Sequence, residues 1–159
     1  MTKRLLHNAQ VIDPEAGTIT RADIRIENGL ITQVSQSPLS ANPHEHSVDC
    51  HNTYLAPGII DIGVKVCEPG ERHKESFKSA GLAAAAGGIT TMVTRPDTTP
   101  AIDSPETLEF IARRANQATP VNVMPMAALT KGRNGREMSE IGFLIDAGAI
   151  AFTDLSLIH

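Results

Sequence analysis

The clearest chemical pattern in this sequence is a set of side chains that alternate along the apolar segment 59–66 and just beyond it. Asp61, Gly63, Lys65 and Cys67 occupy every second position, and a period of two places residues on one face of a β-strand. A carboxylate and an ammonium on one face can pair, whereas a cysteine nucleophile needs a neighbouring base. No histidine shares this face, so we interpret Cys67 as a small, partly buried filler.

A second group of chemically capable residues precedes that segment. His44, His46 and His51 lie close to Cys50 in a polar stretch of the chain. A zinc site needs three or four protein ligands, and no clean spacing emerges here, so solvated histidines are the favoured interpretation. The basic segment 131–136 contains glycines but lacks the P-loop pattern, which predicts a surface loop.

The elements before Pro57 are predicted to be short strands. They cover residues 5–12, 22–27, 30–34 and 48–50. Asn28 and Gly29 separate two alternating runs, which is the strongest short signal for a β-hairpin. The polar stretch from 35 to 47 is predicted to be a loop.

After Pro57 the predicted strands and helices alternate. Strands are expected at 59–66, 89–94, 121–126 and 150–152, and helices at 76–86, 105–118 and 137–147. Four strands and three helices in alternation predict parallel βα units. They fit either a small open α/β sheet, the default from composition alone, or about half of an eight-fold barrel, which needs about 250 residues. The predicted domains are residues 1–56 and 57–159.

Composition limits the classes of function. The chain has 159 residues, a formal charge of −4, 41% hydrophobic and 3% aromatic residues, and two cysteines. This balance predicts a folded protein without a basic face, so neither nucleic acid nor a membrane surface is an expected partner. Two cysteines and no long apolar run predict a cytoplasmic location.

Several segments together resemble the dihydroorotase branch of the amidohydrolase superfamily. They are residues 57–61, 68–70, 73–75 (which includes His73), 83–91, 100–106, 130–132 and 148–154. The amino-terminal strands also resemble the small β-sandwich that precedes the barrel in that family, so the resemblance covers the whole chain. His73, in the segment that leads into the first helix, is expected to have a structural role.

The resemblance implies an α/β fold, a partial (β/α)8 TIM barrel of about four strands and three helices preceded by a small β-sandwich. The family's sandwich is built from both chain ends, so this chain is expected to be an amino-terminal portion or a truncated product. The implied activity is reversible cyclisation of carbamoyl aspartate to dihydroorotate in pyrimidine synthesis. In active members a zinc-bound hydroxide attacks an amide carbonyl that the metal also polarises.

Four positions depart from the family pattern. Gly63 and Lys65 stand where the family has its first two metal-binding histidines, so neither is expected to hold a metal. Cys67 replaces an arginine that grips the substrate carboxylate, and a thiol cannot make that bidentate contact. Asp97 replaces an asparagine that contacts substrate. These changes predict no catalytic residue, no substrate-binding residue and no bound zinc.

The departures suggest that Lys65 fills the emptied metal site as a fixed positive charge. Its expected partners are Asp61 and Asp154, and the alternative is that the lysine stays solvated at the barrel mouth. Asp154 lies in a region that supplies a carboxylate ligand in metal-binding relatives. A lone carboxylate binds divalent ions poorly, so a structural use of Asp154 is favoured over a remnant metal site.

Two functional hypotheses remain open. The first is a non-catalytic dihydroorotase-like protein of pyrimidine synthesis that associates with the aspartate carbamoyltransferase catalytic chain in an oligomer. The second is an active cyclic-amide hydrolase, dihydroorotase-like or hydantoinase-like, with a rearranged metal site. The loss of two ligand positions makes the second hypothesis the less favoured one, because the bound metal stabilises the transition state by several kcal/mol.

Overall fold

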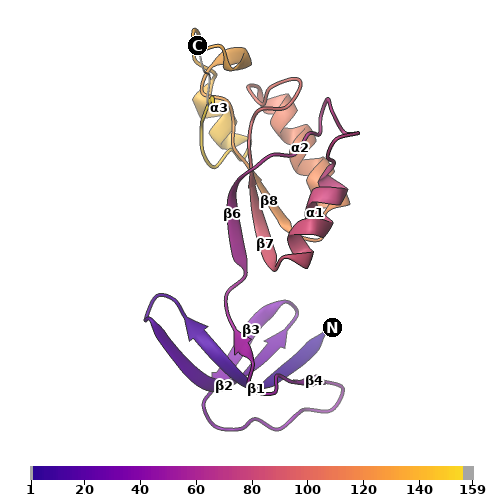
Figure 1. Ribbon diagram of the computed structural model, residues 1–159, viewed down its shortest axis with the longest axis vertical. Helices are drawn as coiled ribbons and strands as arrows, with labels where there is room; N and C mark the ends of the chain where they lie inside the picture. The colour runs from indigo at the N-terminus through magenta and orange to yellow at the C-terminus, as the bar shows by residue number, and fades with distance from the viewer. Residues whose placement is uncertain (1, 156–159) are drawn as a thin grey trace. The chain divides into compact units, whose positions relative to one another are not determined.

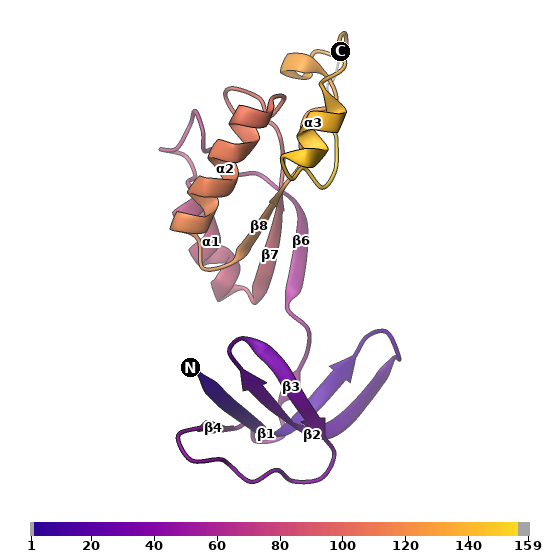
Figure 2. The same ribbon diagram turned by 180° about the vertical axis from the view of Figure 1, so that it is seen from behind.

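The computed structural model of this chain describes residues 2–155. It divides into two compact units, Met1–Pro57 and Gly58–His159, and each unit contains its own β-sheet (Figures 1 and 2). Among the described residues, no helix combines the length and the apolar character needed to cross a membrane.

The first unit is a five-stranded sheet with β1 at its centre. The strands are β1 (Lys3–Asp13), β2 (Thr18–Glu27), β3 (Leu30–Ser35), β4 (His46–Asp49) and β5 (Tyr54–Leu55). Strands β1, β2 and β3 are antiparallel neighbours, whereas β4 and β5 pair with β1 in parallel. Strands β1 to β4 agree with the four strands predicted from the sequence, whereas β5, which has only two residues, was not predicted.

The turn between β2 and β3 follows the predicted hairpin geometry. Asn28 has a φ of 53° and Gly29 a φ of 81°. A two-residue turn of this kind requires positive φ at both central positions, and asparagine and glycine tolerate that region best. The local sequence therefore determines this turn without help from the rest of the sheet.

The sheet of the first unit buries few apolar side chains. Leu5, Ala9, Ala22 and Ile24 are at most 5% exposed. Other apolar residues on β2, β3 and β5 are exposed, namely Ile19, Leu30, Ile31, Val34 and Tyr54. A β-sandwich buries the inner faces of two sheets, but residues 2–57 form one sheet. The second layer of the expected sandwich is therefore not among the residues of this unit.

The second unit alternates parallel strands with helices. In chain order its elements are β6 (Ile59–Val64), α1 (Phe77–Ala86), β7 (Ile89–Thr94), α2 (Pro105–Ala118), β8 (Asn122–Pro125), the 3₁₀ turn η1 (Lys131–Arg133) and α3 (Ile141–Asp146). The strand order is β6-β7-β8 and both pairings are parallel. The predicted parallel βα units are thus present.

The fourth predicted strand is reduced to a short pairing. Ala127 and Phe152 form a single parallel bridge, and the Ala127 N–H donates to the Ala151 carbonyl at 2.9 Å. The last helix is also shorter than predicted. It begins at Ile141 rather than near residue 137, because Met138 pairs with Thr130 in an antiparallel bridge.

Helices α1 and α2 lie on the same side of the second sheet (Figures 1 and 2). Both begin at a serine whose side chain accepts a backbone N–H, Ser76 for α1 and Ser104 for α2, which satisfies donors that have no partner within the helix. The core between sheet and helices includes Phe77, Met92 and Leu108. This packing fixes the carboxyl ends of β6 and β7, where the chemically capable side chains lie.

Candidate functional site at the carboxyl ends of the strands

The candidate site is formed by the residues that follow β6 and β7. Ligand sites of parallel α/β sheets lie beyond the carboxyl ends of the strands. Lys65 comes directly after β6, and Arg95 and Asp97 come directly after β7. The Arg95 N–H donates to the Val64 carbonyl at 3.0 Å, so backbone pairing holds the two strand ends side by side.

Lys65 and Arg95 both pair with Asp97. The Lys65 Nζ atom is 3.3 Å from Asp97 Oδ2, and Arg95 Nη2 is 2.8 Å from the same oxygen. The Asp97 side chain is only 9% exposed, whereas that of Lys65 is 51% exposed. We call these three residues the Asp97 cluster. It has one negative and two positive charges, so Asp97 is neutralised rather than free to repel an anionic ligand.

The predicted partners of Lys65 were wrong. Within residues 2–155 the Lys65 ammonium pairs with Asp97, and neither Asp61 nor Asp154 lies within 4.0 Å of it. The prediction assumed a regular period of two along the first strand. A bulge interrupts that period, because the register of β6 on β7 shifts between Ile62 and Val64 and Gly63 has a φ of 93°.

Asp61 lies on the side of the sheet that faces α1. It is paired in register with Met92, whose side chain is in the core beneath the helices. Together with Val64, Lys65 and Ala80 it lines a hollow of about 270 Å³, although it makes no ion pair with that lysine. The carboxylate is exposed, and no described residue forms an ion pair with it.

Asp154 anchors the segment that follows β8. Its carboxylate accepts hydrogen bonds from the Thr130 N–H at 3.0 Å and the Thr130 hydroxyl at 2.6 Å, while Arg133 donates to its backbone carbonyl. Burial raises the pKa of this carboxyl, but the Thr130 hydrogen bonds and the nearby Arg133 charge outweigh that effect and lower it. Both carboxylate oxygens are therefore occupied in holding a loop.

Glu68 is a buried carboxylate whose role the residue patterns did not reveal. It is 5% exposed, accepts from the Phe77 N–H at 3.0 Å and pairs with Arg114 Nε at 2.7 Å. Burial raises its pKa, but the bonds from Arg114 and Phe77 and the charge of Arg72 produce a net lowering. Glu68 thereby joins the loop after β6 to α1 and α2. Only its long-range partners show this, because Arg114 is 46 residues away.

The residues at the first-strand position do not fit a divalent metal. Gly63 offers no donor atom, and the Lys65 ammonium is an ion-pair partner of Asp97. Lysine carries three donor hydrogens and no acceptor when charged. In the part of the chain that the structure describes, no three His, Cys, Asp or Glu side chains come together in a group that could hold a metal. The donor set at these positions therefore does not fit zinc.

The other candidate residues do not join this site. His44, His46, His51 and His73 are exposed. Both Cys67 and Cys50 are free thiols of intermediate burial, and burial raises the pKa of the Cys50 thiol. Segment 131–136 is not a bare loop, because it contains η1 and is tied to Asp154.

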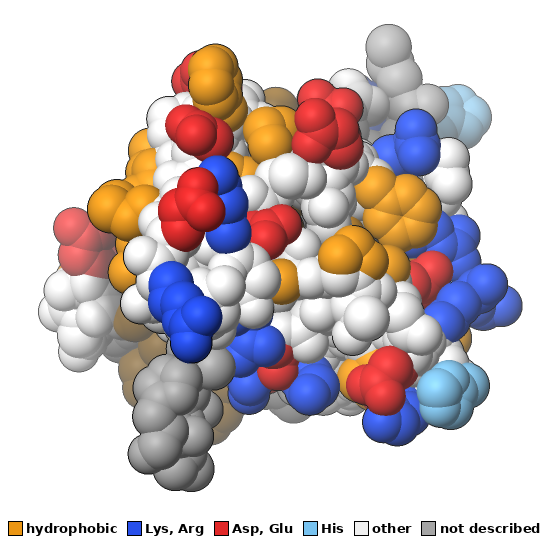
Figure 3. All heavy atoms as spheres, turned by 90° about the horizontal axis from the view of Figure 1, so that it is seen from above, with side chains coloured by type: hydrophobic (Ala, Val, Ile, Leu, Met, Phe, Trp, Pro, Cys, Tyr) orange, Lys and Arg blue, Asp and Glu red, His pale blue; other side chains and the backbone are white. Residues whose placement is uncertain are grey.

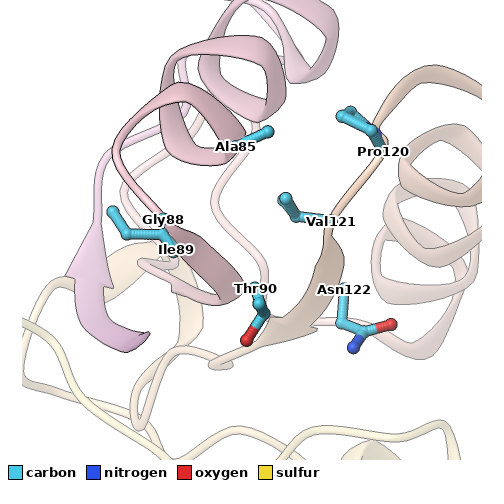
Figure 4. Close-up of a pocket in the computed structure, with 7 residues that line it drawn as sticks. All are labelled: Ala85, Gly88, Ile89, Thr90, Pro120, Val121 and Asn122. Atoms are coloured by element: carbon cyan, nitrogen blue, oxygen red, sulfur yellow. The ribbon is translucent and has the colours of Figure 1, made fainter. Parts of the chain in front are cut away.

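Two further surface features lack the groups that a catalytic site needs. A hollow of about 360 Å³ lies at the amino ends of β7 and β8, where Thr90 and Asn122 are the only polar side chains among its seven lining residues (Figure 4). It has no titratable group and lies at the opposite end of the strands from the Asp97 cluster. In Figure 3, acidic, basic and hydrophobic side chains are interspersed on the side shown, without a field of one sign.

A family model and individual relatives both match this chain, and they indicate the same family. A family model described as "Dihydro-orotase-like" matches residues 53–158. The dihydroorotase of Geobacillus thermodenitrificans is 39% identical over 140 residues, which cover 88% of this chain and 33% of that protein. The dihydroorotase of Aquifex aeolicus is 36% identical over 154 residues, which cover 97% of this chain and 36% of that protein.

Solved structures agree on the fold. The L-hydantoinase (dihydropyrimidinase) from Arthrobacter aurescens superposes with a TM-score of 0.83 at 23% identity, over 96% of this chain and 32% of that one. A D-hydantoinase from Thermus sp. gives 0.70 at 25% identity, over 90% of this chain and 30% of that one.

The second unit thus has the fold of part of an amidohydrolase barrel, in which parallel βα units present polar side chains at one end. The chain belongs to the dihydroorotase-like family. It spans about a third of the length of the curated dihydroorotases that it matches.

Proposed function

We propose that this protein is a dihydroorotase-like protein of pyrimidine synthesis that does not itself catalyse the cyclisation. In this proposal it acts as a structural companion of the aspartate carbamoyltransferase catalytic chain. The observation that carries the proposal is the Asp97 cluster. An ammonium at the first-strand position, where active relatives are expected to have metal-binding imidazoles, is held by a carboxylate from the segment that follows the neighbouring strand.

The chemistry of the cluster supports the non-catalytic part of the proposal. Hydrolysis or closure of a cyclic amide needs an activated water and a polarised carbonyl, and a bound metal supplies several kcal/mol toward both. A protonated lysine repels a divalent cation and cannot deliver hydroxide. Asp97, with both cations on one oxygen, is poorly placed to act as a strong general base.

Metal content and turnover test this part. The full chain is purified in zinc-supplemented buffer and assayed with carbamoyl aspartate, dihydroorotate and hydantoin, with the dihydroorotase of Geobacillus thermodenitrificans as the reference. We expect no stoichiometric zinc by elemental analysis and no turnover above the protein-free blank. Tightly bound zinc together with turnover near the reference would overturn the proposal and favour the cyclic-amide hydrolase with a rearranged site.

A double variant sharpens the result. Gly63→His with Lys65→His returns both imidazoles to the first-strand positions. We expect it to remain inactive, because Asp97 then loses one of its two cations and Cys67 still cannot grip a carboxylate. Turnover restored by these two changes alone would show that the remaining site is intact and would contradict our account of Asp97 and Cys67.

The companion role has its own test. The full chain is co-expressed with the aspartate carbamoyltransferase catalytic chain of the same organism, and the mixture is analysed by size-exclusion chromatography and native mass spectrometry. We expect a complex of defined stoichiometry, and a loss of carbamoyltransferase activity or stability when this chain is omitted. Two proteins that elute separately at micromolar concentration would remove the companion role.

A further inference from the structure

A concave surface in the first unit gathers basic side chains that have few partners within the protein. A hollow of about 340 Å³ is lined by Thr2 before β1, by Lys3 and Arg4 at the start of β1, by His44 before β4 and by His46 at the start of β4. Arg4 and His46 face each other in the parallel register of β1 and β4. None of the five lining residues is acidic. We call this hollow the β1–β4 basic hollow.

The donors of the hollow have few partners within the protein. In the described part of the chain, the side chains of Arg4, His44 and His46 form no hydrogen bond or ion pair, and all three residues are exposed. Lys3 is the exception, because its Nζ lies 3.2 Å from Glu27 Oε1. A guanidinium has five N–H donors and no acceptor, so Arg4 has its full donor set available to a ligand.

The nearest carboxylates are already engaged elsewhere. Glu45 stands between the two histidines in sequence, but its side chain is 0% exposed and pairs with Arg25 Nε at 2.8 Å. Glu27 forms an ion pair with Lys3. The hollow therefore has an excess of positive charge and donors that no neighbouring acid cancels.

The backbone of His44 is also unusual. This residue has a φ of 65°, a left-handed conformation that is uncommon for residues other than glycine, although histidine, asparagine and aspartate adopt it more often than most. Such conformations cost free energy and persist only where the surroundings enforce them. Here the conformation leads the chain into β4 beside the amino-terminal end of β1.

We propose that the β1–β4 basic hollow is a binding site for a phosphate group, either inorganic phosphate or the terminal phosphate of a phosphomonoester. A phosphate presents several acceptor oxygens, and arginine matches that geometry with paired N–H donors. Arg4 supplies the principal contact, while Lys3, the two imidazoles and the Thr2 hydroxyl supply further donors. This site is separate from the Asp97 cluster and does not rest on the proposed function.

Titration of the full chain tests the proposal. Inorganic phosphate and, separately, adenosine monophosphate are added at constant ionic strength while the ¹H–¹⁵N spectrum is recorded. We expect saturable shifts at the amides of residues 2–4 and 44–46. If only the phosphomonoester binds, the source is an organic phosphate. Binding of inorganic phosphate alone identifies the free ion, and linear, unsaturable shifts with both probes overturn the site.

Paired variants make the test specific. Arg4→Gln removes the principal donor and is expected to weaken phosphate binding about tenfold, since one hydrogen bond to a charged group is worth roughly that much. Arg21→Gln is the control, because Arg21 also lies in this unit but donates to Asn8 instead. Equal binding by wild type and Arg4→Gln, or an equal loss in both variants, contradicts the proposal. Unchanged circular dichroism shows that both variants fold.

Discussion

Asp97 shows how one carboxylate controls the charge at the carboxyl ends of β6 and β7. The same oxygen lies 3.3 Å from the Lys65 ammonium and 2.8 Å from the Arg95 guanidinium. Because the side chain is 9% exposed, solvent screens these pairs less than a surface pair. An unpaired aspartate at this depth would be costly, and the two cations compensate its charge.

At the same scale, Glu68 is the carboxylate whose removal should cost most. Glu68→Gln keeps an acceptor for the Phe77 N–H but leaves Arg114 without its charged partner. We expect a loss of about 2 kcal/mol in the free energy of unfolding at pH 7, in the range of hydrogen bonds to charged groups. Urea denaturation measures it. Glu71→Gln is the control, because Glu71 pairs with Lys74 at the surface, where solvent and salt screen the pair, and its loss should cost clearly less than that of Glu68.

The contribution of Glu68 should also depend on pH. Its pKa is lower in the folded protein than its ordinary value of 4.5, so the folded state binds fewer protons than the unfolded state near that pH. The stabilisation is therefore complete above the unfolded value and is lost as pH falls through the folded value. The gap between wild type and Glu68→Gln should narrow below pH 4.5. A gap that stays constant down to pH 3 would contradict this assignment.

Among the elements, α1 and α3 each contain a glycine, and the two have different surroundings. A Cβ atom at Gly81 of α1 would lie 2.7 Å from the Thr119 Cβ and 3.1 Å from the Pro120 Cδ, whereas at Gly142 of α3 nothing lies within 4 Å. The glycine in α1 thus permits close approach of the end of α2. The glycine in α3 serves no such contact.

These two glycines give a matched pair of substitutions. Gly81→Ala should destabilise the protein by about 1–3 kcal/mol. The Thr119 Cβ and the Pro120 ring are attached directly to the backbone, so they cannot move away from the new methyl group without moving the backbone. Gly142→Ala should stabilise it by up to about 1 kcal/mol, because alanine is the better helix former. Thermal denaturation followed at 222 nm distinguishes them. Two shifts of the same sign would refute this account of helix packing.

For the whole molecule, the division into two units gives each unit a core of its own. Leu108 is fully buried in the second unit, and Leu5 is 1% exposed in the first. The first unit depends on a single sheet that buries few apolar side chains. The second has helices over its sheet and therefore the larger apolar core.

Leu108→Ala should lower the free energy of unfolding of the second unit by about 2–5 kcal/mol, the range for buried leucines. Leu82→Ala is the control, since Leu82 of α1 is 55% exposed and its loss should be small. Hydrogen exchange reports each unit separately. Protection of β7 should fall in Leu108→Ala while protection of β1 is unchanged. A parallel fall in β1 would show that the units unfold together.

The sequence by itself determined the local features of this protein. The Asn28–Gly29 turn, the serine-capped helix starts and the alternation of strands with helices depend on the φ preferences and side chains of neighbouring residues, which the sequence displays directly. Family membership could also be inferred from the sequence, because segments that resemble the family occur in the same order along the whole chain. The departures at Gly63, Lys65, Cys67 and Asp97 were also visible in the sequence.

Only the tertiary structure decided which of these residues meet. The bulge at Gly63 breaks the period of two, so Asp61 faces α1 and Lys65 pairs with Asp97 across to the next strand. Glu68 accepts a hydrogen bond from Arg114 of α2, 46 residues away, and Asp154 accepts one from Thr130, 24 residues away. Such partners are set by strand register and by packing between distant elements. Periodicity along a single segment carries no information about either.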